Sequence, residues 1–248
     1  MPNTFETKQE PMIGEPSLDG VLLVDKPSGP TSHDIVDKIR RHFRLAKVGH
    51  AGTLDPQATG LLVIMIGRGT KLANSLMSAD KIYEGTLRLG IATDTQDAQG
   101  KVMSEADPSQ VTEELLTAEM KKLTGDIMQV PPMVSAAKKN GIPLYKLARQ
   151  GKTVERKPKL VRIYEFTLRS FKLPQAEFFL RCSKGVYART LCDDIGSALK
   201  CGAHLASLRR LRSGEFNVLD ACSLEQLMAM DRRQLLRMII PLNKVINS

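Results

Sequence analysis

The chain has 248 residues, of which 42% are hydrophobic and 25% charged, a composition typical of a globular protein and not of a disordered or fibrous one. Its longest apolar run, Leu61–Ile66, is far too short to cross a bilayer, so we expect no membrane association. The first twenty residues are acidic and have no apolar core. We therefore expect no signal peptide, a flexible N-terminal tail over residues 1–19 and a cytoplasmic location.

The positive charge is concentrated in one segment. Between Lys138 and Lys172 there are eleven Lys and Arg residues and two acidic ones, so this segment carries a net charge of +9, equal to that of the whole chain. Such a run can be a solvated face, but its concentration favours a polyanionic partner. The chain has no tryptophan, which argues against recognition by many stacked aromatic rings.

The four cysteines and four histidines have no metal-binding spacing. The cysteines form no C-x-x-C pair and are too few for a disulfide framework. We expect reduced, buried thiols and no metal site.

The N-terminal half is expected to alternate strands and helices. Gly20–Asp25 is a short apolar run closed by a turn rich in proline and glycine, as in a buried strand. Thr31 and Asp34 have the spacing of a capping box, and apolar residues then recur on one helical face as far as Phe43. We next expect a glycine-bearing loop over residues 47–57 and a strand over 61–66. A helix over 70–77, a strand over 82–89 and a polar turn-rich segment over 92–110 should follow.

The C-terminal half is expected to add two strands to the same sheet. We expect a helix over residues 112–123 and a basic loop-helix-loop over 131–159. Two strands over 161–171 and 177–182 and a helix over 190–200 should follow. The last third is expected to be helical and to close with an apolar stretch over residues 238–242. This irregular alternation predicts an α+β (mixed α/β) fold in which a mixed sheet is flanked by helices, forming a single domain over residues 20–248.

The segment Gly49–Gly60, GHAGTLDPQATG, contains three glycines, a histidine and one carboxylate, Asp55. It lacks the Lys-Ser/Thr of a phosphate-binding loop, and Gly67–Gly69 lacks the third glycine of a dinucleotide fingerprint. A carboxylate before proline commonly forms a turn, so the spacing alone leaves Asp55 as a turn former or a catalyst.

This segment resembles the catalytic motif of the TruB family of pseudouridine synthases, with Asp55 at the nucleophile position. Four further blocks resemble the same family, so that the resemblance covers roughly residues 20–242. They are KIY from Lys81 with TDTQDAQG from Thr93, QVPPMVSAAK from Gln129, CSKGVYARTL from Cys182, and GAHL from Gly202 with LRR from Leu208.

The resemblance implies the pseudouridine synthase fold, with a central mixed and largely antiparallel sheet. It implies an isomerase that converts the T-loop uridine at position 55 of tRNA to pseudouridine. The reaction breaks an N-glycosidic bond and forms a C–C bond to the same sugar, so we expect no metal or organic cofactor. The carboxylate of Asp55 could attack C1′, attack C6 of the base or remove a sugar proton, and the sequence leaves all three open.

The resemblance also implies roles for residues around Asp55. Arg189 would pair with Asp55 and keep it ionised. Tyr83 would stack on the flipped uracil and relay a proton, and His50 would fill the space that the base leaves in the RNA. The pocket would further be lined by Lys26, Tyr187 and Leu208.

The basic segment falls where family members carry an insertion that clamps the T-stem-loop of tRNA. Phosphate contacts from residues 131–159 are therefore expected. Only 34 residues follow Gly214, so we expect no complete C-terminal PUA domain. We also expect a monomer that requires no protein partner.

Two alternatives remain beside this interpretation. A non-catalytic tRNA-binding or tRNA-folding protein could share the fold, although Asp55, Tyr83 and Arg189 together argue against a pure binder. The archaeal and eukaryotic guide-RNA relatives share the G-T-L-D-P core but depend on protein partners and a longer C-terminus.

Overall fold

The computed structural model describes residues 18–135, 137–139 and 141–246, except for the side chains of Lys138, Lys139, Arg149 and Ile246. The expected N-terminal tail falls almost wholly outside this part of the chain. Within the described residues, no helix is long and apolar enough to span a membrane.

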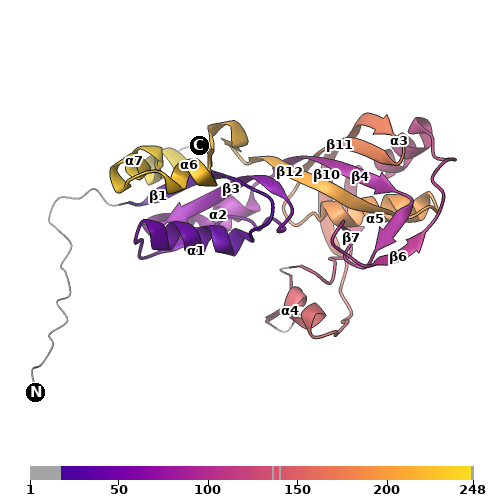
Figure 1. Cartoon of the computed structure of the whole chain (residues 1–248), viewed down its shortest axis with the longest axis horizontal. Coiled ribbons are helices and arrows are strands. Elements are labelled where there is room, and N and C mark those ends of the chain that lie inside the picture. The colour runs from indigo at the N-terminus through magenta and orange to yellow at the C-terminus, as the bar shows by residue number, and fades with distance from the viewer. Residues whose placement is uncertain (1–17, 136, 140, 247–248) are drawn as a thin grey trace, which may run out of the picture.

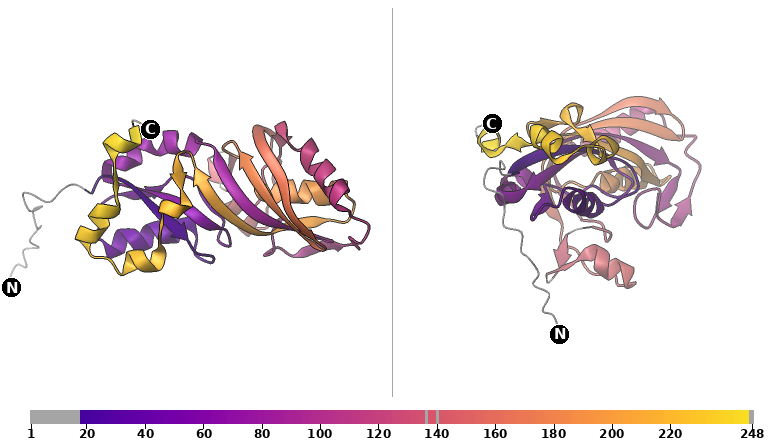
Figure 2. Two further views of the ribbon diagram at one scale, coloured as in Figure 1. Left: turned by 90° about the horizontal axis from the view of Figure 1, so that it is seen from above. Right: turned by 60° about the vertical axis from the view of Figure 1, so that its left-hand side comes forward.

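One sheet of eleven strands runs through the molecule (Figures 1 and 2). Two pairs of neighbouring strands are parallel and the others antiparallel, which confirms the predicted mixed, largely antiparallel sheet. Its main path has the order β14 (Cys222–Ser223), β1 (Gly20–Lys26), β3 (Thr59–Ile66), β12 (Ala203–Ser213), β4 (Lys81–Leu89), β11 (Gln175–Cys182), β10 (Lys159–Lys172) and β7 (Gly125–Gln129). Three short strands each pair with one strand of this path. They are β2 (Val48–His50) on β3, β13 (Phe216–Asn217) on β12 and β15 (Ile240–Pro241) on β1.

The helix α1 (Ser32–His42) begins as its sequence predicts. The Thr31 side chain accepts a hydrogen bond from the backbone N–H of Asp34, whose carboxylate accepts one from the Thr31 backbone N–H, completing the capping box. The apolar face, with Ile35 and Ile39, is buried against β1 and β3. This fixes the start of α1 near the loop that carries Asp55.

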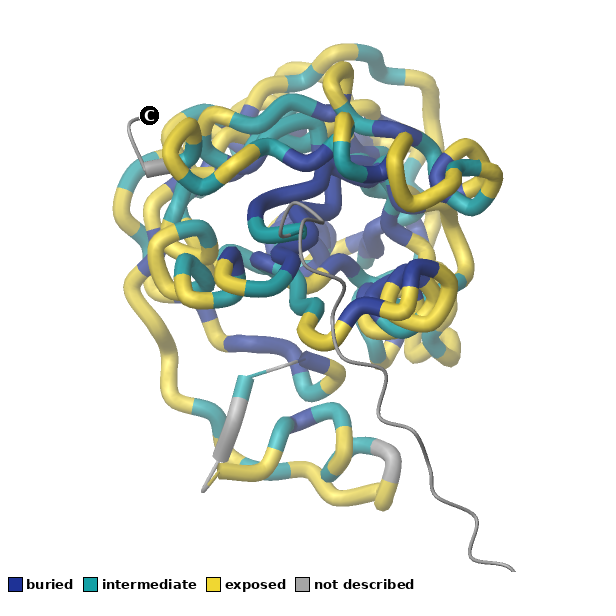
Figure 3. Tube along the Cα trace, turned by 90° about the vertical axis from the view of Figure 1, so that its left-hand side faces the viewer, coloured by how far each residue is buried: buried dark blue, intermediate teal, exposed yellow. Residues whose placement is uncertain are grey.

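Helices cover the two halves of the sheet differently. Around β1 and β3, one face packs against α1, α6 (Leu224–Met228) and α7 (Arg232–Met238). The other face packs against α2 (Ala73–Ser78) and α8 (Leu242–Ile246). In the second half, α3 (Glu113–Lys122) and α5 (Ala188–Ala198) pack on the core formed with β4, β10 and β11. Buried residues follow the strands at the centre of the molecule (Figure 3).

The strand β12 joins the two halves, and the sequence did not predict it. It pairs in parallel with β3 and antiparallel with β4, so the expectation of a helical C-terminal third is wrong for residues 203–213. Gly60 makes the β3 contact possible, because it has φ of +97° and a Cβ there would lie 2.3 Å from the Arg210 carbonyl oxygen.

Other departures from the sequence predictions are local. The polar segment 92–110 contains a strand pair, β5 (Ile91–Thr93) and β6 (Val102–Glu105). The helix expected over residues 70–77 is divided into a 3-10 turn, η1 (Gly67–Leu72), and α2; a second such turn is η2 (Val218–Asp220).

The basic connection between β7 and β10 is a loop-helix-loop, as predicted. It contains the pair β8 (Lys138–Lys139) and β9 (Ile142–Pro143) and the helix α4 (Leu144–Arg149). Figure 1 shows α4 standing apart from the sheet. The Arg156 guanidinium ties the end of this connection to its beginning by donating to the Pro131 carbonyl at 3.0 Å.

Candidate active site

A pocket of about 290 Å³ opens where the loop after β2 meets the start of α5 and the middle of β4 and β12. Five residues with expected roles line it, namely Asp55, Tyr83, Arg189, Tyr187 and Leu208. The pocket is therefore built from segments that are far apart in the sequence.

The carboxylate of Asp55 and the guanidinium of Arg189 form a bidentate ion pair. Arg189 Nε lies 2.9 Å from Asp55 Oδ2, and Arg189 Nη2 donates to Asp55 Oδ1 at 3.2 Å. The Arg189 side chain is 4% exposed and that of Asp55 41%, so the arginine lies beneath the carboxylate. This geometry fixes the orientation of the carboxylate while leaving part of it accessible.

Three other groups hold the Arg189 guanidinium in place. It donates to the carbonyls of Val134 at 2.8 Å and Thr95 at 3.1 Å, and it lies 3.3 Å from the Asp97 carboxylate. Three segments of the chain, which contain Asp55, residues 95–97 and Val134, thus meet at one buried cation. Such a fully bonded guanidinium is a rigid support for Asp55.

Although the Asp55 side chain is 41% exposed, the protein around the pocket desolvates its carboxyl and so raises the pKa above the ordinary aspartate value. The positive charge of Arg189 opposes this effect, and the negative charge of Asp97 adds to it. Arg189 lowers this pKa, as expected, but desolvation has the larger effect. A carboxylate with a raised pKa is a stronger base and nucleophile than an exposed one.

The backbone on both sides of Asp55 is held by buried polar side chains. The Ser32 hydroxyl accepts a hydrogen bond from the Leu54 N–H at 2.9 Å and donates to the Leu54 carbonyl at 3.1 Å. The Lys26 ammonium donates to the carbonyls of Pro56 and Ala58, each at 2.8 Å.

Lys26, which was expected to line the pocket, contacts the backbone of the loop that carries Asp55. Its side chain is fully buried, donates also to the Pro27 carbonyl and does not line the Asp55 pocket. Burial lowers the pKa of its ammonium to about 8. The contacts of Lys26 are with the backbone of the loop that carries Asp55.

Tyr83 lies on β4 and faces the pocket beside Leu208. Burial raises the pKa of its hydroxyl, while the charge of Arg210 opposes the shift. The hydroxyl therefore stays protonated near neutral pH and can donate a proton.

Two basic pocket residues were not predicted from the sequence. Arg210, which is 1% exposed, donates to the carbonyls of Leu61 at 2.7 Å and Gly52 at 3.0 Å. Lys81 donates to the carbonyls of Met77 and Ala79, and burial lowers its pKa to about 8. Both residues belong to sequence blocks that resemble the TruB family, Arg210 to LRR and Lys81 to KIY. Only the fold shows that their charges are buried at the pocket.

His50 ends β2 and does not line the pocket. Burial and the charge of Arg210 lower the pKa of its imidazole, so the ring is neutral near pH 7. The Nδ1 atom is buried and has no hydrogen-bond partner among the described residues. The role expected for His50, inside the RNA, stays a prediction.

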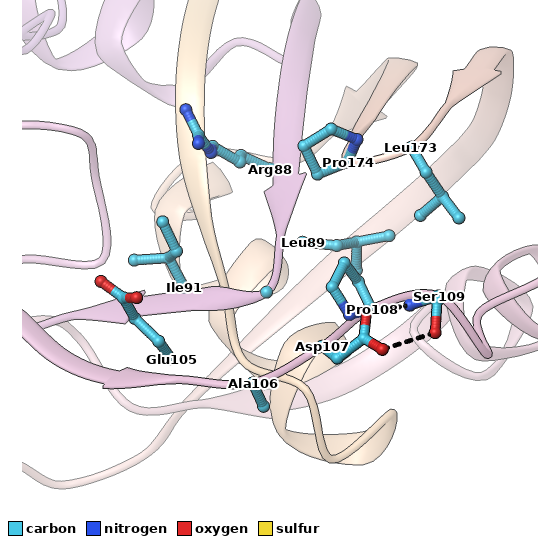
Figure 4. A pocket seen from close by; sticks show the side chains of 11 residues that line it. Arg88, Leu89, Ile91, Glu105, Ala106, Asp107, Pro108, Ser109, Leu173 and Pro174 are labelled. Atoms are coloured by element: carbon cyan, nitrogen blue, oxygen red, sulfur yellow. Dashed lines mark hydrogen bonds between the residues drawn. The ribbon is translucent and has the colours of Figure 1, made fainter.

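A larger pocket of about 650 Å³ lies at the far end of β4 (Figure 4). It lies between the Leu173–Pro174 turn and residues 105–109, where Ser109 donates a hydrogen bond to Asp107. It shares no residue with the Asp55 pocket, and no residue with an expected role lines it. Size therefore does not identify the active site.

Comparisons with known proteins cover most of the chain. Residues 40–188 match the N-terminal domain of the TruB family pseudouridylate synthases, and residues 189–247 match the tRNA pseudouridylate synthase B C-terminal domain. The proteins named tRNA pseudouridine synthase B of Opitutus terrae and Syntrophotalea carbinolica are each 49% identical to this chain. The first match covers 90% of this chain and 93% of the relative, and the second 88% and 72%.

Solved structures share the fold. A chain in a Cbf5-Nop10-Gar1 complex matches 92% of this chain with a TM-score of 0.73 and 28% identity. A chain of an H/ACA RNP bound to a substrate RNA containing 2'-deoxyuridine matches 90% with a TM-score of 0.67 and 26% identity. The match spans about three fifths of each of these chains, 62% and 59%. From the family matches, the identity to the curated relatives and the shared fold, this chain belongs to the TruB family of pseudouridylate synthases.

Proposed function

We propose that this protein is a tRNA pseudouridine synthase that isomerises the T-loop uridine of tRNA, using Asp55 as its reactive carboxylate. The observation that carries the proposal is the Asp55–Arg189 ion pair in a pocket that also contains Tyr83. The relatives named tRNA pseudouridine synthase B support the substrate class.

The reaction needs a group that assists glycosidic bond cleavage. The bond between N1 of uracil and C1′ of the sugar breaks, the base turns, and C5 bonds to C1′. The C5 proton is lost and N1 gains a proton, so that substrate and product have the same atoms. A carboxylate can support this sequence as nucleophile or base without an external reactant.

The other pocket residues have complementary roles in this proposal. Arg189 fixes the orientation of Asp55. Tyr83 and Leu208 hold the uracil ring, and the protonated Tyr83 hydroxyl supplies a proton. His50 occupies the space that the flipped base leaves, which offsets the lost stacking of a few kcal/mol.

We further propose that residues 20–248 act as one catalytic unit, in which the insertion 131–159 holds the T-stem-loop. The junction between the two matching family models, at residues 188 and 189, falls inside α5, and β12 lies between β3 and β4 in one sheet. In the insertion, Lys146, Lys152 and Lys157 are exposed. Lysines so placed suit phosphate contacts that do not depend on base sequence. The proposal includes a monomer that works in the cytoplasm without a protein partner.

A T-arm stem-loop tests the proposal. The purified chain should convert one uridine in its loop to pseudouridine, which nucleoside analysis of the digested RNA detects. A stem-loop in which that uridine is replaced by cytidine is the matched control. Binding of the stem-loop without any pseudouridine would instead support the alternative of a non-catalytic tRNA-binding protein.

A further inference from the structure

We propose that Gln129 is a positioning residue for the reaction. Its side-chain amide fixes the backbone of Tyr187, two residues before Arg189, and so sets the Arg189 guanidinium against Asp55. This inference rests on the proposed function, because it concerns the same ion pair.

Gln129 and Tyr187 are joined by two hydrogen bonds. Gln129 Nε2 donates to the Tyr187 carbonyl at 3.1 Å, and Gln129 Oε1 accepts from the Tyr187 N–H at 2.8 Å. Gln129 is 3% exposed and lies 58 residues away in the sequence. The amide thus pairs with both polar groups of one residue, as a neighbouring strand would. Only one orientation of the amide satisfies both groups, so its oxygen and nitrogen are assigned by the contact itself.

The start of α5 has no side-chain cap of its own, so a contact from outside the helix is needed to fix its first turn. Tyr187 is the N-cap residue, but its side chain makes no capping hydrogen bond. Ser, Thr, Asp or Asn usually occupies this position and fixes the first turn. The Tyr187 carbonyl accepts from the N–H groups of Thr190 and Leu191, so the backbone that Gln129 holds is the one that begins the helix.

Arg189 is the second residue of α5, so any shift of the first turn moves its guanidinium. The same connection that leaves β7 after Gln129 also provides the Val134 carbonyl, which accepts from Arg189 Nη2 at 2.8 Å. The end of β7 therefore holds Arg189 through the helix backbone, and the next residues hold it through its side chain. Gln129 itself does not line the Asp55 pocket, so it acts on the reaction through the backbone of Tyr187 and the start of α5, which carries Arg189.

The first test replaces Gln129 by Met, which has similar length and no hydrogen-bonding amide. Misplacement of a catalytic group by about 1 Å can cost roughly a hundredfold in rate, so Gln129→Met should slow single-turnover conversion of the T-arm stem-loop by about ten- to a hundredfold. The affinity for the stem-loop should be unchanged. Circular dichroism should confirm that the variant is folded at the assay temperature.

Gln226→Met is the matched control. The Gln226 side chain accepts a hydrogen bond from the Ser223 N–H in the capping box of α6, and neither residue lines the Asp55 pocket. This variant also loses an amide that holds a helix start, and it should keep the wild-type rate.

A double mutant separates positioning from stability. If Gln129 acts through Arg189, adding Gln129→Met to Arg189→Lys should cause no further loss of rate, because the guanidinium is already gone. Additive losses would overturn the inference, as would a full rate in folded Gln129→Met when the wild-type protein is active. An inactive wild-type protein would instead refute the proposed function.

Gln129→Glu gives an independent readout if the Met variant does not fold. A protonated carboxyl can still donate to the Tyr187 carbonyl, whereas an ionised carboxylate cannot. The rate of this variant relative to wild type should therefore fall as the pH rises. A ratio that does not change with pH would contradict the inference.

Discussion

The Ser32 hydroxyl bonds both backbone polar groups of Leu54, the residue directly before Asp55. Ser32 is the first residue of α1 and is buried, so the helix start and the reactive loop share one rigid contact. Together with the Lys26 ammonium on the other side of Asp55, it fixes the path of the loop. Asp55 is thus oriented from its backbone as well as by Arg189.

Ser32→Ala should reduce both stability and rate. It leaves a buried N–H and a buried carbonyl of Leu54 unsatisfied, which typically costs about 1–3 kcal/mol of unfolding free energy. Urea unfolding and single-turnover assays measure the two effects. Ser223→Ala, which removes the cap of α6, should cost about 1 kcal/mol without changing the rate. Equal rates in folded Ser32→Ala and wild type would show that the contact does not orient Asp55.

The raised pKa of Asp55 predicts the acid limb of the pH profile. The ionised carboxylate is the reactive form, so the rate should fall as the pH drops through this pKa. Because burial raises the pKa, the fall should begin above the range of an ordinary aspartate, whose pKa is about 3.9. Single-turnover rates at decreasing pH, with folding checked at each point, test this. A rate that stays constant down to about pH 3.9 would contradict the assignment.

Tyr83→Phe should separate the ring of Tyr83 from its hydroxyl. The ring should still hold the uracil, so affinity for the stem-loop should be unchanged. Loss of a proton-transferring group typically costs about 10²–10⁴-fold in rate. Binding and single-turnover assays should show this pattern. A wild-type rate in Tyr83→Phe would mean that Tyr83 stacks on the uracil but does not transfer a proton.

The basic insertion should bind RNA phosphates electrostatically, without reading the base sequence. Replacing four of its basic residues by Gln should flatten the slope of log K against log salt by roughly 0.7–0.9 for each phosphate that the variant no longer neutralises. Bound substrate should react at an unchanged rate, because these side chains bind ground and transition states alike. The residues are Lys138, Lys139, Arg149 and Lys152.

The matched control replaces four exposed lysines outside the insertion and outside the Asp55 pocket, where no RNA contact is expected. These are Lys101, Lys121, Lys122 and Lys200. A salt slope that is the same in wild type and in the insertion variant would mean that the charge of the insertion is only a solvated face.

The sequence predicted the sheet and the reactive pair for different reasons. The strand around Leu61–Ile66 and the α1 capping box follow from local apolar pattern and spacing, so they were predictable without the fold. Asp55 and Arg189 are 134 residues apart, and only the resemblance to the TruB family joined them before their contact was seen.

Features that depend on distant backbone groups were missed. The strand β12 carries Arg209, Arg210 and Arg212, a charged pattern that does not resemble a central strand. Arg210 is buried there because carbonyls of Leu61 and Gly52 accept from it. The contacts of Lys26 were missed for the same reason, since its carbonyl partners lie up to 32 residues away.

The replacement of Asp55 by Asn tests the central claim most directly. The amide has nearly the same shape but is neither nucleophilic nor basic, so Asp55→Asn should bind the T-arm stem-loop like wild type and form no pseudouridine. Asp37→Asn, on α1 and outside the Asp55 pocket, is the matched control and should be fully active. Pseudouridine formation at an appreciable rate by highly purified Asp55→Asn protein would contradict the account.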